Sequence, residues 1–214
     1  MTDATWAMVA GVVVIALVDW FAVRTENRQL EYAAKPATMV ALIGVALELH
    51  PVDSSMRTWF VIALVCSLAG DVLLMLPNEE LFVAGLGSFL VGHVAYIVGL
   101  ISGGVSTGAV VVGAIITLVL LGSFAPTIIK GAKEKDARLA VPVFIYVLTI
   151  SVMVTLAIGS TVPIAIAGAA LFYASDFTIG WSKFVADFAQ SRMVIITTYH
   201  LAQLLLVLSL TRAR

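Results

Sequence analysis

Eight stretches of this sequence are long and apolar enough to cross a lipid bilayer as helices, and they limit what the chain can fold into. A helix needs about 20 mostly apolar residues to span the hydrocarbon. Of the 214 residues, 61% are hydrophobic and only 12% are charged. The sequence therefore predicts an all-α, polytopic membrane protein, with eight transmembrane helices in one bundle and a single integral membrane domain over residues 1–214. The expected spans are 6–23, 34–49, 58–76, 80–101, 106–126, 139–158, 161–180 and 192–210.

Charge, cysteine content and motifs exclude several functions and structural features. The net charge of -1 gives no basis for binding nucleic acid, so we expect membrane lipids as the surroundings of the chain. The single cysteine, Cys66, lies in the third span and has no second cysteine with which to form a disulfide. The sequence contains neither a phosphate-binding glycine loop nor a zinc-ribbon spacing. Composition leaves the oligomeric state open.

Lys and Arg residues are distributed unequally between the two membrane sides that eight spans define. The termini share one side with the loops after spans two, four and six, and that side holds Arg57, Arg212 and Arg214. Positive residues concentrate in cytoplasmic loops. We therefore expect a multi-pass protein with both termini extracytoplasmic, in the inner membrane if the source is a bacterium. The remaining Lys and Arg residues lie on the predicted cytoplasmic side: Arg24, Arg28, Lys35, Lys130, Lys133, Lys135, Arg138, Lys183 and Arg192.

Ionisable residues inside the predicted spans are the main candidates for function. An ionisable group at membrane depth costs at least ~2.5 to 3.5 kcal/mol, so such residues face the bundle interior and usually mark a site. Asp19, Asp71 and Asp176 each fall about one helical turn from the same side of the membrane. The residues in this class are Asp19, Lys35, Asp71, His93, Asp176 and His200.

A structural role competes with a functional one at several of these positions. Asp19 and Lys35 lie near the expected interface, where extension of the side chain toward water lowers the cost, so both readings stay open. His93 and His200 are equally compatible with packed, hydrogen-bonded residues. For Asp71, inside "SLAGDVLLM", and for Asp176 we favour a functional role, because buried membrane carboxylates are usually functional.

Short similarities suggest a repeat of four spans plus four. "SLAGD" in the third span is similar to "YASD" in the seventh, and each aspartate is followed one span later by neighbouring histidine and tyrosine residues. Because four spans separate the two copies, the halves would be parallel repeats. The hypothesis places Asp71 and Asp176 around one cavity.

Five stretches in order along the chain resemble the YhhN family, which includes the TMEM86-type lysoplasmalogenases. The resemblance implies an eight-span enzyme, an ether hydrolase of lipid metabolism, that cleaves the vinyl ether bond of lysoplasmalogens to a fatty aldehyde and a glycerophospho-base. One position departs from the pattern, because His200 stands where a second tyrosine is expected. The stretches are "KPATM" from Lys35, "SLAGDVLLM" from Ser67, "FVAGLGSFLVGHVAYI" from Phe82, "GAALFYASDFTIG" from Gly168 and "TYHLAQ" from Thr198.

Vinyl ether hydrolysis needs a proton donor and an anionic partner, as does glycoside hydrolysis through an oxocarbenium-like transition state. Two carboxylates in different surroundings supply both, since burial and mutual repulsion keep one protonated while the other is ionised. We predict Asp71 and Asp176 as this catalytic pair, with the acid and the base unassigned. Lys35 and Arg24 are predicted to bind the phosphate of a lysophospholipid substrate. The other predicted substrate-binding residues are Asp19, His93, Tyr96, Tyr199, His200 and Gln203.

Two other interpretations compete with carboxylate catalysis: a zinc-dependent hydrolase and a membrane protein without catalytic activity. A zinc site is not expected, because only His93 and His200 lie at membrane depth and no two histidines are paired on one helix. No other cofactor is expected either. A proton-coupled transporter or a non-catalytic lipid-binding protein stays open. Transporters often have interrupted spans near the site, whereas here the prolines are expected near span ends, which favours an enzyme. These are Pro36, Pro126, Pro142 and Pro163.

Overall fold

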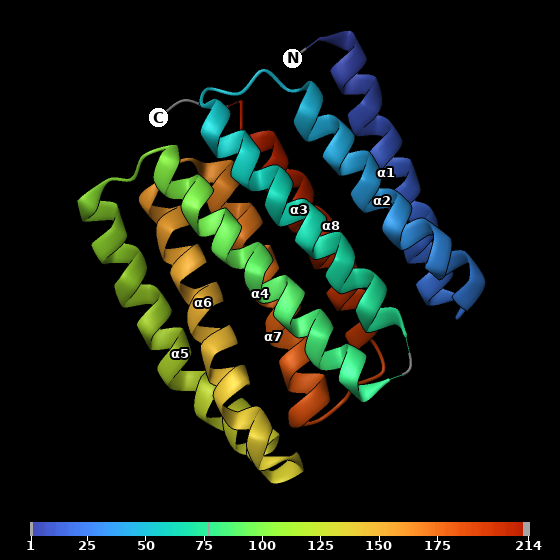
Figure 1. The fold of residues 1–214 in the computed structure, drawn as a ribbon, viewed down its shortest axis with the longest axis vertical. Coiled ribbons are helices and arrows are strands. Elements are labelled where there is room, and N and C mark those ends of the chain that lie inside the picture. The colour runs from blue at the N-terminus through green and yellow to red at the C-terminus, as the bar shows by residue number, and fades with distance from the viewer. Residues whose placement is uncertain (1, 77, 212–214) are drawn as a thin grey trace.

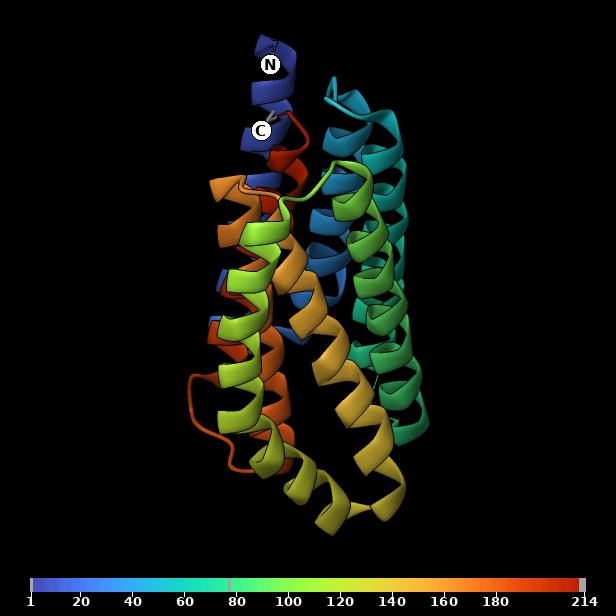
Figure 2. The ribbon, with the colours of Figure 1, turned by 90° about the vertical axis from the view of Figure 1, so that its left-hand side faces the viewer.

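The computed structural model describes residues 2–76 and 78–211, and in this part of the chain all regular structure is helical. The helices form one elongated bundle, in which α1 begins and α8 ends at the same end (Figures 1 and 2). The all-α prediction is confirmed. The elements are α1 (Asp3–Arg24), α2 (Arg28–Glu48), α3 (Ser54–Met75), α4 (Glu79–Ser102), α5 (Thr107–Lys135), a short 3-10 turn η1 (Ala137–Leu139), α6 (Ala140–Gly159), α7 (Pro163–Phe184) and α8 (Ser191–Ser209).

All eight α-helices are long and apolar enough to cross a membrane. In each helix, less than half of the apolar stretch that could cross the membrane is buried inside the protein, from 17% in α5 to 44% in α8. The remaining surface carries large apolar side chains such as Leu118 and Val119, each 63% exposed. A bundle with this surface requires lipid around it, because so many exposed apolar residues would be costly in water. The prediction of eight spans is confirmed.

Two helices, α2 and α5, extend furthest beyond the spans that the sequence predicts. Helix α2 begins at Arg28 instead of near residue 34, and the side chain of Asn27 caps it by accepting a hydrogen bond from the Leu30 amide at 3.2 Å. Helix α5 continues to Lys135, through the charged segment that the sequence places in a loop. Hydropathy marks only the apolar part of a helix, so polar turns that extend the same helix beyond the hydrocarbon are missed.

The expectation that prolines lie near helix ends is wrong for two of the four. Pro36 lies inside α2 and Pro126 inside α5. The longer helices explain the error, since further helical turns precede Pro36 and follow Pro126. Neither proline ends its helix, so the spans are continuous, but proline position no longer argues against a transporter.

Helices α3 and α4 pack closely through small residues, as the spacing of Gly85, Ser88 and Gly92 indicates. A Cβ atom at Gly92 would lie 3.2 Å from the carbonyl oxygen of Ala63. The hydroxyl of Ser88 donates a hydrogen bond to the carbonyl oxygen of Cys66 at 2.7 Å. Small side chains allow such close approach of backbones between membrane helices. Ser88 and Gly92 therefore allow the close contact between α3 and α4.

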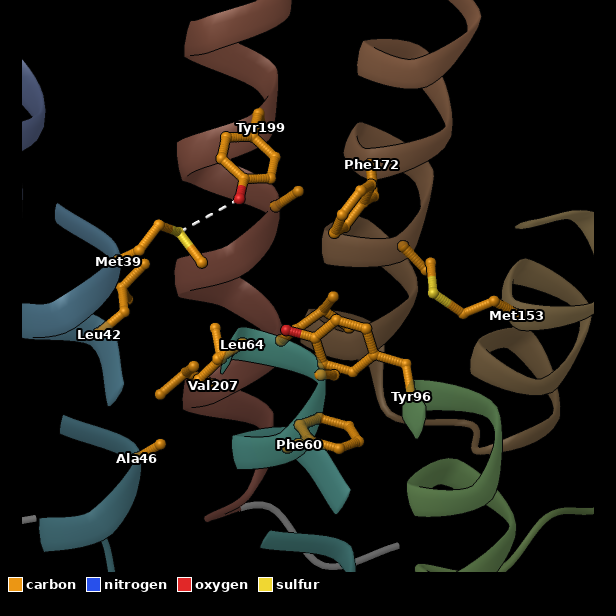
Figure 3. Close-up of a cluster of buried hydrophobic side chains, with 14 of the residues drawn as sticks. Met39, Leu42, Ala46, Phe60, Leu64, Tyr96, Met153, Phe172, Tyr199 and Val207 are labelled. Carbon is orange, nitrogen blue, oxygen red and sulfur yellow. Dashed lines mark hydrogen bonds between the residues drawn. The ribbon is translucent and has the colours of Figure 1, made fainter. Parts of the chain in front are cut away.

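The centre of the bundle is a cluster of aromatic side chains from four helices (Figure 3). Phe60 of α3 meets Tyr96 of α4 edge-on at 4.9 Å between ring centroids, and Phe172 of α7 meets Tyr199 of α8 at 5.6 Å. Edge-to-face contacts of this kind stabilise a core beyond the area that the rings bury. The cluster therefore holds α3, α4, α7 and α8 in fixed positions around the polar residues of the interior.

Close contact between α5 and α7 depends on Gly131. A Cβ atom there would overlap the backbone carbonyl oxygen of Phe184 in α7. We expect Gly131→Ala to destabilise the protein by about 1–3 kcal/mol, because the backbones must separate. Gly122, on the same helix, has no other atom within 4 Å of such a Cβ, so Gly122→Ala is the matched control. Thermal unfolding in detergent measures both variants, and an equal Tm for the two would contradict the packing.

Candidate active site

Asp71, near the end of α3, is a buried carboxylate with a cationic partner. Its side chain is 1% exposed, and Oδ1 lies 2.9 Å from Nζ of Lys35 in α2. Oδ2 accepts a hydrogen bond from the Tyr199 hydroxyl of α8 at 2.6 Å. The Lys35 ammonium also lies 5.8 Å from the centre of the Tyr199 ring. Three helices thus join at one carboxylate, and both of its oxygens are paired.

The position of Lys35 differs from the prediction. The sequence places Lys35 at the start of its span, but α2 begins at Arg28, so Lys35 lies inside the helix. Its side chain is 14% exposed. The side chain is thus partly exposed, while its Nζ contacts Asp71. A cation in this setting has further donors for an anion such as a phosphate.

Asp176 of α7 has neutral partners instead. Its Oδ2 accepts a hydrogen bond from the hydroxyl of Tyr146 in α6 at 2.5 Å. Nε2 of His93 in α4 lies 3.4 Å from the same oxygen, and His93 is 1% exposed. The His93 ring packs edge-on against Tyr146 at 5.3 Å between centroids. The site therefore consists of a carboxyl, a phenol and an imidazole in contact.

Sequence reasoning missed Tyr146. It is the one tyrosine of the sixth predicted span, in the apolar segment "VFIYVLTI". A buried tyrosine hydroxyl usually has a hydrogen-bond partner. This rule could have marked Tyr146 as a candidate, but it does not say which buried polar group the hydroxyl contacts.

An aromatic layer lies between the two carboxylate sites. The Phe172 ring contacts Tyr199, the partner of Asp71, at 5.6 Å and His93, the neighbour of Asp176, at 4.8 Å. Figure 3 shows Phe172 beside Tyr199 in the interior of the bundle. The sites are thus neighbours with separate hydrogen-bond partners.

An apolar cavity opens beside Asp176. Its volume is about 730 Å³, including the open part, and α4, α5, α6 and α7 form most of its wall. Asp176 and Tyr146 are among the residues that line it, whereas Asp71 is not among its lining residues as the structure describes them. A cleft with mostly apolar walls and a few polar groups is typical for a small-molecule site. Its other lining residues include Phe89, Phe124, Ile128, Val147, Ile150 and Phe177.

Asp19 and His200 form a third buried polar group. Nδ1 of His200 accepts a hydrogen bond from the Trp20 indole at 3.2 Å, and Nε2 lies 3.8 Å from Oδ2 of Asp19. Asp19 is 0% exposed, and neither of its oxygens has a hydrogen-bond partner among the described residues. Asp19 therefore does not extend toward water, which is one of the two readings that the sequence leaves open. The bundle covers it on all sides.

The remaining predicted substrate-binding residues lie in different surroundings. The Tyr96 hydroxyl donates a hydrogen bond to Oε1 of Gln203, and both side chains are fully buried. Arg24, the last residue of α1, is exposed and makes no ion pair with any residue that the structure describes. Arg192 instead is fixed at this end of the bundle, where its Nη2 donates to both carboxylate oxygens of Glu31 at 2.9 and 2.7 Å.

The same polar groups contain carboxyl and imidazole side chains, which are residue types that can bind metal ions. Within residues 2–76 and 78–211, no three His, Cys, Asp or Glu side chains are close enough together to hold a metal ion. The chemistry that these groups offer is that of carboxyl, phenol, imidazole and ammonium side chains. Such groups transfer protons and bind anions.

The ion pair between Lys35 and Asp71 has a measurable effect on stability. Removing one partner of a buried pair costs about 3–5 kcal/mol, because the other charge is left unpaired, while replacing both is often neutral. We expect Lys35→Met and Asp71→Asn each to lower the Tm, and the double variant to recover most of the loss.

The exposed pair between Lys130 and Glu134, 3.9 Å apart, provides the control for this cycle. Lys130→Met should leave the Tm nearly unchanged, because exposed pairs contribute about 0–1 kcal/mol. A double variant of Lys35 and Asp71 as unstable as the sum of the single variants would contradict the pairing.

The known proteins that this chain resembles share one name, lysoplasmalogenase. The chain is 33% identical over 192 residues to a lysoplasmalogenase of Mycobacterium tuberculosis (strain CDC 1551 / Oshkosh), with 85% of this chain and 70% of that protein covered. It is 31% identical over 153 residues to lysoplasmalogenase TMEM86B of Homo sapiens, with 71% of this chain and 62% of the human protein covered. The mouse TMEM86B is 32% identical over 154 residues, with 70% and 62% covered.

No solved structure matches the chain at a significant level. The family model described as the YhhN family matches residues 30–210, which include Lys35, Asp71, His93, Asp176 and Tyr199. The matched range extends over seven of the eight membrane helices, from α2 to α8. This chain therefore belongs to the YhhN family.

Proposed function

We propose that this membrane protein hydrolyses the vinyl ether bond of lysoplasmalogens, with release of a fatty aldehyde and a glycerophospho-base. The relatives that carry the name lysoplasmalogenase suggest the reaction. The structural observation that supports it is the apolar cavity with Asp176 and Tyr146 in its wall. The apolar wall suits a single aliphatic chain, and a carboxyl group lies beside it, as the acid–base chemistry of a vinyl ether requires.

The reaction consumes one water molecule and proceeds in three steps. An acid donates a proton to the alkene carbon remote from the oxygen, which leaves an oxocarbenium ion. Water adds to the carbon of this cation and loses a proton to a base, which gives a hemiacetal. The hemiacetal then separates into the aldehyde and the glycerol hydroxyl, with the proton transferred to the leaving oxygen. A positioned acid–base group contributes typically 10²- to 10⁴-fold to steps of this kind.

Asp71 and Asp176 are the proposed acid and anionic partner. Both are buried among aromatic rings, where charge interactions are stronger than in water. Lys35 is the proposed phosphate ligand, because it is a cation whose side chain is partly exposed beside the buried site. Arg24 remains a predicted headgroup contact at the end of α1. His93, Tyr96, Tyr199, Asp19, His200 and Gln203 are proposed to position water and the polar part of the substrate.

Asp176→Asn tests this proposal directly. We expect the purified protein in detergent to release aldehyde from a lysoplasmalogen, and the variant to lose at least 100-fold in kcat, because an amide replaces the carboxyl group neither as acid nor as anion. Asp71→Asn is expected to lose activity as well. An alkyl-ether lysolipid, which has no alkene carbon to protonate, is the substrate control. Absence of release from the wild type across headgroups would contradict the proposal and favour a transporter or a lipid-binding protein.

The membrane orientation is part of the proposal. We propose that the ends joined by the loops after α1, α3, α5 and α7 face the cytoplasm, because most Lys and Arg residues lie there. Both termini are then extracytoplasmic, and the carboxylates lie nearer the cytoplasmic leaflet. A C-terminal tag should be accessible to a membrane-impermeant reagent from outside the cell. Accessibility only from the cytoplasm would reverse the orientation.

A further inference from the structure

The partners of the two buried carboxylates follow one pattern. Asp71 lies on α3, the third helix of the first half of the chain, and Asp176 on α7, the third helix of the second half. Asp71 is contacted by Lys35 from the second helix of its own half, and Asp176 by Tyr146 from the second helix of its own half. Each is also contacted from the fourth helix of the opposite half. These contacts come from Tyr199 on α8 and His93 on α4.

The packing of the helices agrees with this pattern, in which each half contributes its fourth helix to the carboxylate of the other half. In each half the first helix packs on the second, the second on the third and the third on the fourth. Between the halves, α2 packs on α8 and α4 packs on α6, so the fourth helix of each half lies against the second helix of the other. The contact of α1 with α8 has no strong counterpart between α5 and α4 among the described residues. The symmetry is therefore approximate, and it is closest around the two carboxylates.

The equivalent positions carry different chemistry. Lys35, a cation, takes the place in the first half that Tyr146, a neutral phenol, takes in the second. Only Asp176 of the two carboxylates is among the described lining residues of the apolar cavity. An ammonium at 2.9 Å favours the ionised form of a carboxylate, whereas a phenol donates a hydrogen bond without adding a full charge.

We infer that the two carboxylates are equivalent positions of a duplicated four-helix unit that have diverged, so that Asp176, positioned by Tyr146, delivers the proton to the substrate while Asp71 stays an anion fixed by Lys35. The inference rests on the proposed hydrolysis and assigns the two roles that the proposal leaves open. Divergence of this kind separates a proton donor from an anion within one bundle, as different environments do for paired carboxyls in other hydrolases.

The hydrogen bonds also indicate which oxygen acts. Oδ2 of Asp176 accepts the Tyr146 hydrogen bond and faces Nε2 of His93, so the transferable proton of Asp176 lies on Oδ1. That proton moves to the alkene carbon, whose π electrons form the new C–H bond. The anion that remains keeps its hydrogen bond from Tyr146. When water adds to the oxocarbenium ion, its proton returns to Oδ1, which restores Asp176 for the next cycle.

Labelling with dicyclohexylcarbodiimide tests the assignment without any need for turnover. This apolar reagent adds to a protonated carboxyl group: the proton goes to one carbodiimide nitrogen, the oxygen bonds to the central carbon, and acyl transfer to nitrogen gives a stable N-acylurea. We expect peptide mass spectrometry of the labelled full chain to find the adduct on Asp176, at least tenfold more than on Asp71. An adduct mainly on Asp71, or none on Asp176, would overturn the inference.

Kinetics of Tyr146→Phe provide the second measurement. We expect kcat to fall at least tenfold while KM stays within twofold, because the variant keeps the ring in the cavity wall and loses only the hydrogen bond to Asp176. Tyr32→Phe is the matched control, since the Tyr32 hydroxyl donates to the Met75 carbonyl oxygen at the exposed surface. An unchanged kcat in Tyr146→Phe would overturn the positioning role.

The two experiments separate the inference from the proposed function. If the wild type releases no aldehyde, the hydrolase proposal fails whatever the labelling shows. If aldehyde is released but the carbodiimide labels Asp71, hydrolysis stands and the assignment of roles fails.

Discussion

Buried carboxylates in a membrane bundle must find their partners inside the protein, and this constraint determines how the helices meet. The hydrocarbon around the bundle offers no water to an ionised oxygen. Lys35 and Tyr199 supply both partners of Asp71, and they come from helices at opposite ends of the sequence. The contact of α2 and α3 with α8 thereby brings the two ends of the chain together. The same requirement joins α4, α6 and α7 at Asp176.

Much of the fold and part of the site could be predicted from the sequence, for a physical reason. Membrane spans are long and apolar, so their number follows from hydropathy, and ionisable residues among them are few enough to be recognised singly. The chosen residues Lys35, Asp71 and Tyr199 do contact one another. Pairing was less predictable, because a sequence gives the depth of a residue and its helix face but not the neighbouring helix. Tyr146, in an ordinary apolar segment, and the complete burial of Asp19 were missed for this reason.

The two carboxylate sites differ in their partners, and this difference connects the structure with the proposed chemistry. One carboxylate is held by an ammonium group and belongs to the polar interior. The other meets a phenol and an imidazole, and it borders a cavity whose wall is otherwise apolar. A lipid with one aliphatic chain presents both kinds of surface, because its chain suits the cavity and its phosphate suits the cation. The chemistry of the site therefore supports a lysolipid as substrate, in agreement with the names of the relatives.

Hydrolysis in deuterium oxide tests the central claim, that a protein acid donates a proton to the alkene carbon of a vinyl ether. The account predicts one deuterium on the carbon next to the carbonyl of the released aldehyde, measured by mass spectrometry. The same aldehyde incubated with the protein in deuterium oxide corrects for exchange after release. An aldehyde without deuterium at that carbon, after this correction, would contradict the account, because the bond would then have been broken without protonation of the alkene.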